Sequence, residues 1–454
     1  MSFSRYPEYK DSGLKWIGEI PIHWHTCRAK TLFANRKEIA LKDDAQLSAT
    51  QKYGVVPQSL FMSEQGQKVT LALSGTGNFR HVQSGDFVIS LRSFQGGLEY
   101  SKHTGCVSPA YIVLKPLQLV AASFFRYLLK STVFISYINI FSDGIRDGKT
   151  ISYDQFSGVC LSTPPIQEQS QIARFLDHET AKIDTLIREQ ERLIELLKEK
   201  RQAVISHAVT KGLYPDAPMK DSGVEWLGEV PEGWEVKRLK HLGDSIIGLT
   251  YSPADIVYEG TGTLVLRSSN VQGGKIVFDD NVYVATAIPV TLVTQVGDIL
   301  ICSRNGSRAL IGKNAMIDET SAGLTFGAFM TIFRSQHSGY ISCVLNSPLF
   351  EFQSGAFMTS TINQLTIGVL NNFEVPFPPT DERERIVKFL ETETAKFDVL
   401  TAEAQRAIDL LQERRSALIS AAVTGKIDVR NWQPSSDESA FPEEVRQAGM
   451  EATP

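Results

Sequence analysis

The chain has 454 residues, of which 42% are hydrophobic and 21% are charged, values typical of a globular protein with room for two to four domains. Its apolar runs are shorter than the roughly 18 residues needed to span a bilayer. The N-terminal sequence MSFSRYPEYKDSG also lacks the apolar centre of a signal peptide. These features exclude a membrane protein, and we expect a cytoplasmic location.

The cysteines and histidines give no sign of a metal site. The five cysteines are scattered, and no two lie two or three residues apart, which argues against a zinc ribbon and a disulfide framework. His23 and His25 form an HxH pair, but no cysteine or acidic cluster accompanies them. We expect no metal and no cofactor.

The net charge of −5 is unevenly distributed along the chain. Residues 1–163 hold 18 basic and 12 acidic side chains, whereas residues 213–377 hold 10 basic and 16 acidic ones. A chain with this charge can bind a polyanion only if its basic groups gather on one face of each domain. The acidic second domain favours such binding less than the first.

The chain opens with a motif that occurs twice. KDSGLKWIGEIPIHW, over residues 10–24, returns as KDSGVEWLGEVPEGW over residues 220–234, at an offset of 210. Later, SGDFVISLR over 84–92 aligns with VGDILICSR over 296–304 at an offset of 212. Residues 164–210 and 378–424 align at an offset of 214, with 25 of 47 positions identical. The chain is therefore an internal duplication with similar ends and diverged middles.

The diverged middles are predicted to be mixed α/β. The short apolar runs after Asp86 and Asp298 follow a Gly-Asp turn and predict strands. The segment 123–130 has the pattern of a helix.

The similar ends are predicted to be long helices. After Pro164-Pro165 the chain continues to about Val209 without Pro or Gly, which predicts a helix of about 40 residues and roughly 60 Å. Lys211-Gly212 and Gly425-Lys426 would end the two copies. Each carries an apolar stripe, interrupted by Gln190 and Ala404 among others, that we expect to pair with the other in an antiparallel coiled coil. The stripe residues are Ile172, Leu176, Ile183, Leu186, Leu193, Leu197, Val204, Ile386, Leu390, Phe397, Leu400, Leu411 and Leu418.

Three motifs suggest chemistry but fail on spacing or context. The segment 144–150, GIRDGKT, has one residue too few between its glycines for a phosphate-binding loop, and the ISYDQF that follows does not predict a helix. The segment 74–78 lacks the third glycine of a dinucleotide fingerprint. Pro164-Pro165 and Pro378-Pro379 lack the neighbours of an adenine methyltransferase loop. We therefore expect no catalytic residues.

Polar and basic residues in the presumed loops are of the kinds that contact base edges and phosphates. Arg146 and Lys149, in the glycine-rich segment, suit a DNA phosphate as well as a nucleotide. The candidate DNA-binding residues are Thr76, Asn78, Arg80, Arg92, Ser93, Gln95, Arg146 and Lys149 in the first domain, and Arg267, Ser269, Asn270, Gln272, Arg304, Asn305 and Arg308 in the second.

Three features of the sequence are found together in one known family. They are the repeated KDSGxxWxGxxPxxW opening, the Gly-Asp-strand-Arg middle, and the runs PPIQEQSQIARFLDHETAKID and PPTDERERIVKFLETETAKFD. In these features the chain resembles the DNA-specificity subunit of type I restriction-modification systems. The resemblance extends to about residue 427, with Arg383 in the second run where Gln169 stands in the first. It implies two target-recognition domains that each recognise half of a split, asymmetric site on double-stranded DNA. It also implies helices that fix the spacing and dock two modification (methyltransferase) subunits, and restriction (ATP-dependent nuclease) subunits that supply the cleavage.

We accordingly expect an α+β fold with pseudo-twofold repetition, in which two long antiparallel helices separate two mixed domains. The expected boundaries are a first recognition domain over 1–163, a central helix over 164–212, a second recognition domain over 213–377, a C-terminal helix over 378–427 and a disordered acidic tail over 428–454. The main alternative is a non-catalytic coiled-coil scaffold with two protein-binding heads, which the acidic second domain favours.

Overall fold

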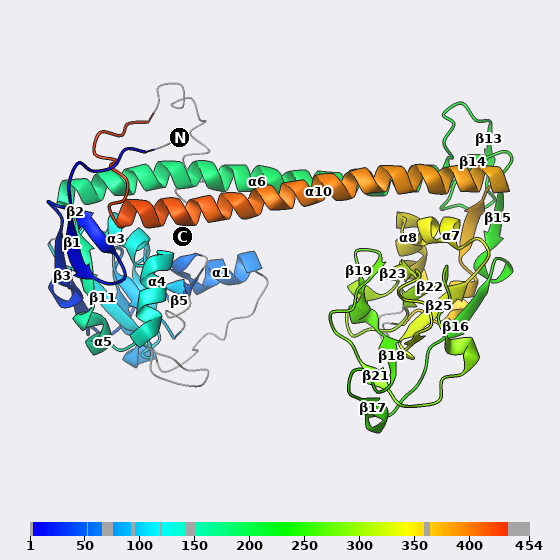
Figure 1. The fold of residues 1–454 in the computed structure, drawn as a ribbon, viewed down its shortest axis with the longest axis horizontal. Coiled ribbons are helices and arrows are strands. Elements are labelled where there is room, and N and C mark those ends of the chain that lie inside the picture. Colours follow the sequence, from blue (N-terminus) through cyan, green and yellow to red (C-terminus); the bar gives the residue numbers. More distant parts are fainter. Residues whose placement is uncertain are drawn as a thin grey trace. The chain divides into compact units, whose positions relative to one another are not determined.

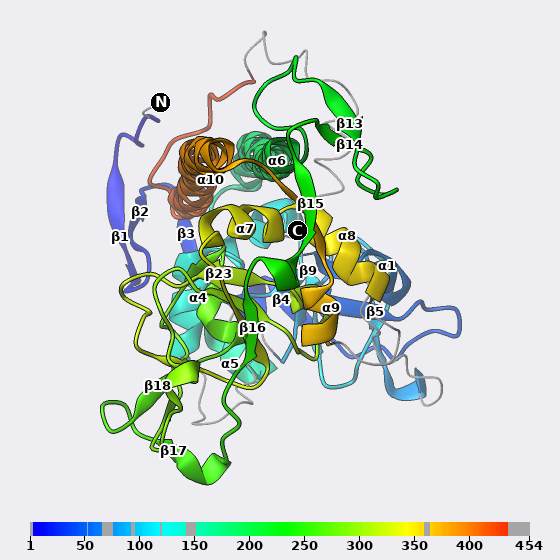
Figure 2. The ribbon, with the colours of Figure 1, turned by 90° about the vertical axis from the view of Figure 1, so that its right-hand side faces the viewer.

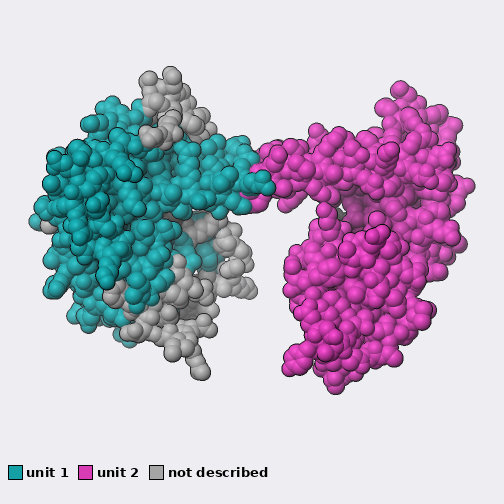
Figure 3. Space-filling model, in the orientation of Figure 1, with its two compact units in different colours: residues 1–191, 406–454 teal, residues 192–405 magenta. Residues whose placement is uncertain are grey.

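The computed structural model describes residues 3–51, 53–65, 76–91, 96–118, 120–141, 151–357 and 364–434. The chain forms two compact units, one of residues 1–191 and 406–454 and the other of residues 192–405 (Figure 3). Each unit holds one globular domain, part of one long helix and part of the other. The predicted α+β fold with two similar halves and two packed helices is confirmed (Figure 1).

The two long helices are α6, Ile166–Thr210, with 45 residues, and α10, Thr380–Val423, with 44. Each begins next to a Pro-Pro pair, because proline disfavours helix in the residue before it. Each is followed by a glycine with a positive φ, +78° at Gly212 and +76° at Gly425. At the end of α10 the amide of Lys426 donates to the carbonyl of Ala421, as in a glycine-terminated helix. Figure 2, which looks along both helices, shows them side by side.

The helices are antiparallel, and one ion pair in each unit records the register. In the first unit Arg415 Nε lies 2.9 Å from Asp184 Oδ1. In the second unit Arg201 Nη1 lies 2.5 Å from Asp398 Oδ1. At the repeat offset of 214, Asp184 corresponds to Asp398 and Arg201 to Arg415. The two ion pairs are therefore the same interaction, made once in each half of the duplicated sequence.

The apolar stripe is buried over part of its length. Of the stripe residues predicted to pair, Ile172, Leu176, Ile183, Ile386, Leu390 and Phe397 are buried, Leu197, Val204, Leu411 and Leu418 are half-buried, and Leu186, Leu193 and Leu400 are exposed. Ala404, expected as an interruption, is instead buried, and so is Ile408. Ala404 and Ile408 therefore extend the buried stripe of α10.

Both ends of the helix pair join a domain core. In the first unit Ile172 and Leu176, near the start of α6, share a core with Ala422 and Val423 at the end of α10. In the second unit Ile386 and Leu390 of α10 share a core with Ile205, Ala208 and Val209 of α6. Each domain thus packs on the start of one helix and the end of the other.

In the first unit, the hairpin β1–β2 and the pair β3–β12 lie beside the helices, and the central sheet has the order β4-β11-β8-β9. The strands are β1 Tyr9–Leu14, β2 Gly18–Pro21, β3 His25–Arg28, β4 Phe33–Arg36, β5 Leu47–Thr50, β6 Gly54–Pro57, β7 Arg80–Val82, β8 Phe87–Ile89, β9 Glu99–Tyr100, β10 Gly105–Val107, β11 Ile112–Pro116 and β12 Cys160–Thr163. The shorter helices are α1 Gln58–Gln65, α3 Ala122–Leu128, α4 Thr132–Ile138 and α5 Tyr153–Gly158.

The second unit repeats this plan, with the hairpin β13–β14, the pair β15–β26 and a central sheet of order β16-β25-β22-β23. A second sheet has the order β17-β21-β18-β24, in which β18 is antiparallel to β21 and parallel to β24. In the first unit β5 is likewise antiparallel to β6, and Gln46, next to β5, forms a parallel bridge with Cys106 of β10. The strands are β13 Met219–Asp221, β14 Glu229–Pro231, β15 Glu235–Arg238, β16 Asp244–Ile247, β17 Ile256–Val257, β18 Thr263–Leu266, β19 Val271–Gln272, β20 Lys275–Ile276, β21 Tyr283–Val284, β22 Ile299–Cys302, β23 Asn314–Met316, β24 Thr325–Phe326, β25 Met330–Arg334 and β26 Glu374–Phe377. The shorter helices are α7 Ser338–Leu345, α8 Pro348–Phe357 and α9 Ile367–Asn371.

The two strands predicted after the Gly-Asp turns, β8 and β22, occupy the same place in the two central sheets. The predicted helix near residue 123 is α3. One expectation was wrong: the sequence after residue 150 does form a helix, α5, which Ser152 caps in a capping box with Gln155. The Ser-x-x-Gln spacing is the signal that could have predicted it.

Residues 428–434, placed by sequence in the acidic tail, pack within the first unit. The amide of Asp428 donates to the carbonyl of Ser4 at 2.8 Å. The ring of Trp432 meets that of Phe175 edge-on, with centroids 5.3 Å apart. Residues 435–454 lie outside the described part of the chain.

Candidate nucleic-acid interface

An arginine paired with a buried aspartate anchors each Gly-Asp turn. Gly85 and Gly297 have φ values of +99° and +88°, which a residue with a side chain adopts only at a cost. The turn aspartates accept a hydrogen bond from the backbone three residues earlier, at 2.8 Å in both copies. Asp86 pairs with Arg36 of β4, whereas Asp298 pairs with Arg334 of β25.

The two arginines lie on strands that are not equivalent in the two central sheets. Both copies therefore have the ion pair, but a different strand provides the arginine in each. Burial raises the pKa of Asp86, and the hydrogen bond from Arg36 opposes that effect. The turns hold the starts of β8 and β22, and the loop that follows β22 contains Arg304.

In the second unit, two of the predicted loops lie together. Asn305 Nδ2 donates to Ser268 Oγ at 3.1 Å, which joins the loop after β22 to the loop after β18. Arg304 and Arg308 are exposed at this junction. The joined loops place several of the predicted polar and basic residues on one surface.

The candidates in the loop after β18 have different environments. Arg267 pairs with Asp280, 2.8 Å from its carboxylate. Gln272 is exposed, and Ser269 is half-buried. Asn270, predicted to face DNA, is fully buried, and it accepts from the amide of Arg267 and donates to the carbonyl of Val277. Asn270 therefore shapes the loop from inside, which corrects its expected role.

Fewer of the first-domain candidates can be placed. Asn78 is exposed, and Arg80, at the start of β7, donates to the carbonyl of Lys37 at 3.3 Å. Thr76 begins a short 3₁₀ helix, Thr76–Asn78. Arg92, Ser93, Gln95, Arg146 and Lys149 lie outside the described residues.

The repeated Trp-Gly-Pro opening connects each domain to both helices. Trp24 Nε1 donates to Glu168, in the first turn of α6, at 2.9 Å, and Trp234 Nε1 donates to Glu382 of α10 at 3.0 Å. A side chain on Gly425 would overlap Pro21 and contact the Trp24 ring. The glycine that ends one helix therefore packs beneath the tryptophan that is bonded to the start of the other.

Further polar groups surround Glu168. Tyr6 donates to its carboxylate at 2.6 Å, and His23 Nε2 lies 2.7 Å from the second oxygen. Burial and the hydrogen bond to Glu168 raise the pKa of Tyr6. His23, considered above as half of an HxH pair, is thus a partner of a carboxylate. Among the described residues, no group of three or more His, Cys, Asp or Glu side chains could hold a metal ion.

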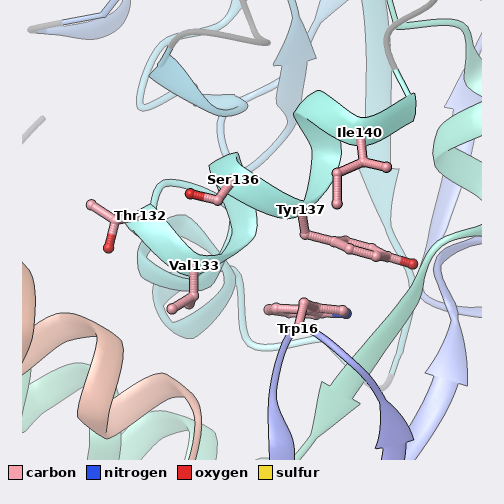
Figure 4. A pocket seen from close by; sticks show the side chains of 6 residues that line it. All are labelled: Trp16, Thr132, Val133, Ser136, Tyr137 and Ile140. Atoms are coloured by element: carbon pink, nitrogen blue, oxygen red, sulfur yellow. The ribbon is translucent and has the colours of Figure 1, made fainter.

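An open hollow of about 350 Å³ lies beside the first tryptophan of the opening. Trp16 stacks on Tyr137 of α4, with centroids 5.2 Å apart and planes at 17° (Figure 4). In the second unit the equivalent Trp226 meets Phe352 of α8, with centroids 5.8 Å apart. The hollow is lined mainly by apolar groups and brings together no set of catalytic side chains (Figure 4).

Two other carboxylates have displaced pKa values. Burial raises the pKa of Glu99 to about 7, although Lys130 lies 2.7 Å away and opposes the shift. Hydrogen bonds from Ser321 and Thr320 lower the pKa of Asp318 to about 2. Each has an evident structural cause, and neither indicates a general acid or base.

In the part of the chain that the structure describes, no helix is long and apolar enough to cross a bilayer.

Two similar α+β halves, each packed on both helices, define a two-domain protein built on an internal repeat. Its family is shown by the sequence profile of the type I restriction modification DNA specificity domain, which matches twice, over residues 21–196 and 231–408. The chain therefore belongs to the specificity subunits of type I restriction-modification systems, a non-catalytic class with two target-recognition domains.

Known relatives agree with this assignment. The chain is 28% identical over 220 residues to the EcoKI specificity subunit of Escherichia coli, a match that covers 46% of each protein. It is 22% identical over 466 residues to a putative MjaX specificity subunit of Methanocaldococcus jannaschii, covering 93% of this chain and 98% of the relative.

Solved structures share the fold. A chain from a study of the assembly and conformational transition of a type I system matches with a TM-score of 0.68 and 16% identity, covering 89% of this chain and 98% of that one. The HsdS subunit from Thermoanaerobacter tengcongensis matches with a TM-score of 0.50 and 16% identity, covering 90% and 98%.

Proposed function

We propose that each recognition domain of this chain recognises one half of a bipartite, asymmetric site on double-stranded DNA. The helices would set the spacer between the halves and dock two methyltransferase subunits. Restriction subunits with ATP-driven nuclease activity would complete the complex, in the cytoplasm. This chain itself would bind no cofactor and select the site on which its partners act.

The observation that carries the proposal is the contrast between the two parts of the repeat. Between the two helix segments, 25 of 47 aligned positions are identical. The ion pair Asp184–Arg415 of the first unit also has its equivalent in Arg201–Asp398 of the second. The domain middles, by contrast, differ in sequence and in charge. Conserved supports and diverged loops suit a constant spacing device that carries two different recognition surfaces.

A domain exchange tests this division of labour. The chain is assembled with its methyltransferase partner, and methylated adenines are mapped across a genome. Exchange of residues 213–377 for those of another family member should change one half-site and leave the other half-site and the spacer unchanged. The proposal fails if active complexes methylate without a split motif, or if both half-sites change together.

The alternative function, a scaffold with two protein-binding heads, rests on the acidic character of the second domain. The two functions differ in their response to salt. Contacts to phosphates release counterions, so affinity for DNA should fall steeply between roughly 50 and 200 mM salt. A protein-binding scaffold would show no such DNA affinity at any salt concentration.

A further inference from the structure

The arginines of the second domain are mostly neutralised by carboxylates of the domain itself. Residues 213–377 contain five arginines. Three of them form ion pairs: Arg238 with Glu374, Arg267 with Asp280, and Arg334 with Asp298. The other two, Arg304 and Arg308, are exposed and form no ion pair with a described residue. Of the arginines in this acidic domain, Arg304 and Arg308 are therefore the two whose guanidinium groups can bind a negatively charged or electron-rich partner.

The backbone at Arg304 is fixed from several sides. The carbonyl of Phe329 accepts from the amides of both Ser303 and Arg304, each at 3.0 Å. It also accepts from Ser303 Oγ at 3.0 Å. On the other side Arg304 forms a β-bridge with Gln364, and the amide of Leu365 donates to the carbonyl of Ser303 at 2.7 Å. The Cα of an exposed arginine is thus held by two segments distant in sequence.

The side chain is also supported. The Arg304 guanidinium carbon lies 5.3 Å from the centroid of the Phe329 ring, and that ring is 59% exposed although it is a large apolar group. A cation over an aromatic face is attracted to it, which narrows the range of positions open to the guanidinium. Phe329 was not among the residues predicted from sequence, because an exposed phenylalanine has no pattern that separates it from a core one.

A planar guanidinium held in this way suits one base in particular. Arginine donates two parallel hydrogen bonds to O6 and N7 of guanine in the major groove, the commonest specific contact in protein–DNA complexes. Prior ordering of the side chain reduces the entropy lost on binding. Arg308, four residues further on, has no ring contact in the described structure. It suits a phosphate, because contact with a phosphate does not require a fixed orientation of the guanidinium.

We propose that Arg304 recognises a guanine in the half-site of the second domain and that Phe329 is the positioning residue that orients it. This inference rests on the proposed function, since it names a base within the site that the domain selects. The expected loss on removing the arginine is preference for that one base pair, roughly ten- to a hundredfold, with the rest of the motif retained.

The test uses the chain assembled with its methyltransferase partner. Methylation is mapped for the wild type, Arg304→Lys, Arg304→Ala, Phe329→Leu and Arg308→Ala. Affinity is then measured for duplexes in which each base pair of the second half-site is replaced in turn. Arg304→Lys keeps the charge and removes the two-pronged geometry, so it separates recognition from general attraction to DNA. Thermal unfolding of each variant checks that the domain is intact.

Arg304→Ala should lose the guanine preference at one position. Arg304→Lys should lose part of it at that same position, because an ammonium group can reach O6 and N7 but lacks the planar fork of a guanidinium. Phe329→Leu should weaken the preference there by about two- to fivefold, because the guanidinium is retained but less ordered. Arg308→Ala should lower affinity for all duplexes alike. A merely structural role for Phe329 would change affinity without singling out one base pair.

The proposal is overturned if the second half-site contains no G·C pair, or if Arg304→Lys keeps full preference at every position. It is also overturned if Arg308→Ala, and not the Arg304 variants, relaxes one position. These outcomes leave the proposed function standing as long as exchange of residues 213–377 still changes one half-site. Loss of that exchange effect would instead refute the function itself.

Discussion

At the residue scale, a substitution between the two copies conserves an interaction while changing the side chain that makes it. Gln169 Nε2 donates to the carbonyl of Pro164 at 2.9 Å, and at the equivalent position Arg383 donates to the carbonyl of Pro378 at 2.5 Å. Both side chains are buried. The Arg383 guanidinium also lies 4.0 Å from the Phe377 ring, which stands where the first copy has Thr163. The second copy therefore has both a larger donor and an aromatic ring beside it.

The same scale shows an asymmetry that can be measured. Glu168 is buried and contacts Tyr6, His23 and Trp24, whereas the equivalent Glu382 is half-buried and accepts from Trp234. Glu168→Ala should destabilise the first unit by about 2–5 kcal/mol, because buried donors lose a charged acceptor. Glu382→Ala should cost the second unit only about 1 kcal/mol.

Hydrogen exchange measured by mass spectrometry reports on peptides of each unit separately and so distinguishes the two variants. Loss of protection should be confined to the unit that carries the substitution. Equal losses from both substitutions would mean that the additional contacts of Glu168 contribute nothing to stability.

These hydrogen-bond partners could not be predicted from the sequence, because it shows which side chains can donate or accept but not which of them meet. Asn270 illustrates the difficulty. An asparagine in a polar loop has the composition of a base-contacting residue, but here its amide satisfies the loop's own backbone. Only the course of the loop distinguishes the two roles. Arg304 was identifiable from sequence because it follows a strand at the same position as Arg92 in the other copy.

At the element scale, the long helices were predictable because a repeated three- and four-residue apolar spacing over 40 residues has no other common explanation. Their register was not, since an apolar stripe tolerates several alignments. The ion pairs at Asp184 and Asp398 reveal it. The short helix α5 was missed because six residues give too little periodicity, and its evidence lies in the cap at Ser152.

The buried stripe makes a direct prediction about α10. Ile408 is 4% exposed, whereas Leu410, two residues away on the same helix, is 59% exposed. Ile408→Ala should lower the free energy of unfolding of the first unit by about 2–4 kcal/mol through lost burial and a residual cavity. Leu410→Ala should change it by no more than about 0.5 kcal/mol. Urea denaturation followed by circular dichroism measures both, and similar losses would contradict the assigned helix face.

At the scale of the whole molecule, duplication accounts for the way one chain forms two similar units. Each domain needs the start of one helix and the end of the other to complete its core, so neither helix belongs to a single domain. Expression of residues 1–191 alone would leave Ile172 and Leu176 without the Ala422 and Val423 that share their core. The sequence pattern separates the domains from the helices. The compact units of the structure instead each combine one domain with parts of both helices.

The proposed spacing role can be tested by lengthening both helices together. Seven residues inserted into α6 between Asp184 and Arg201, and seven into α10 between Asp398 and Arg415, keep the apolar faces in phase and leave both terminal cores intact. They add about 10.5 Å at 1.5 Å per residue, which corresponds to about three base pairs.

Methylation mapping of this variant should show both half-sites unchanged and the spacer longer by about three base pairs. A matched variant, with seven residues inserted after Trp432 and therefore outside both helices, should keep the original spacer. A longer helix pair with an unchanged spacer would mean that something other than the helices sets the distance. The conserved ends and diverged middles of the repeat suggest that spacing and recognition belong to separate parts of the chain. Altered half-site sequences in this variant would contradict that separation.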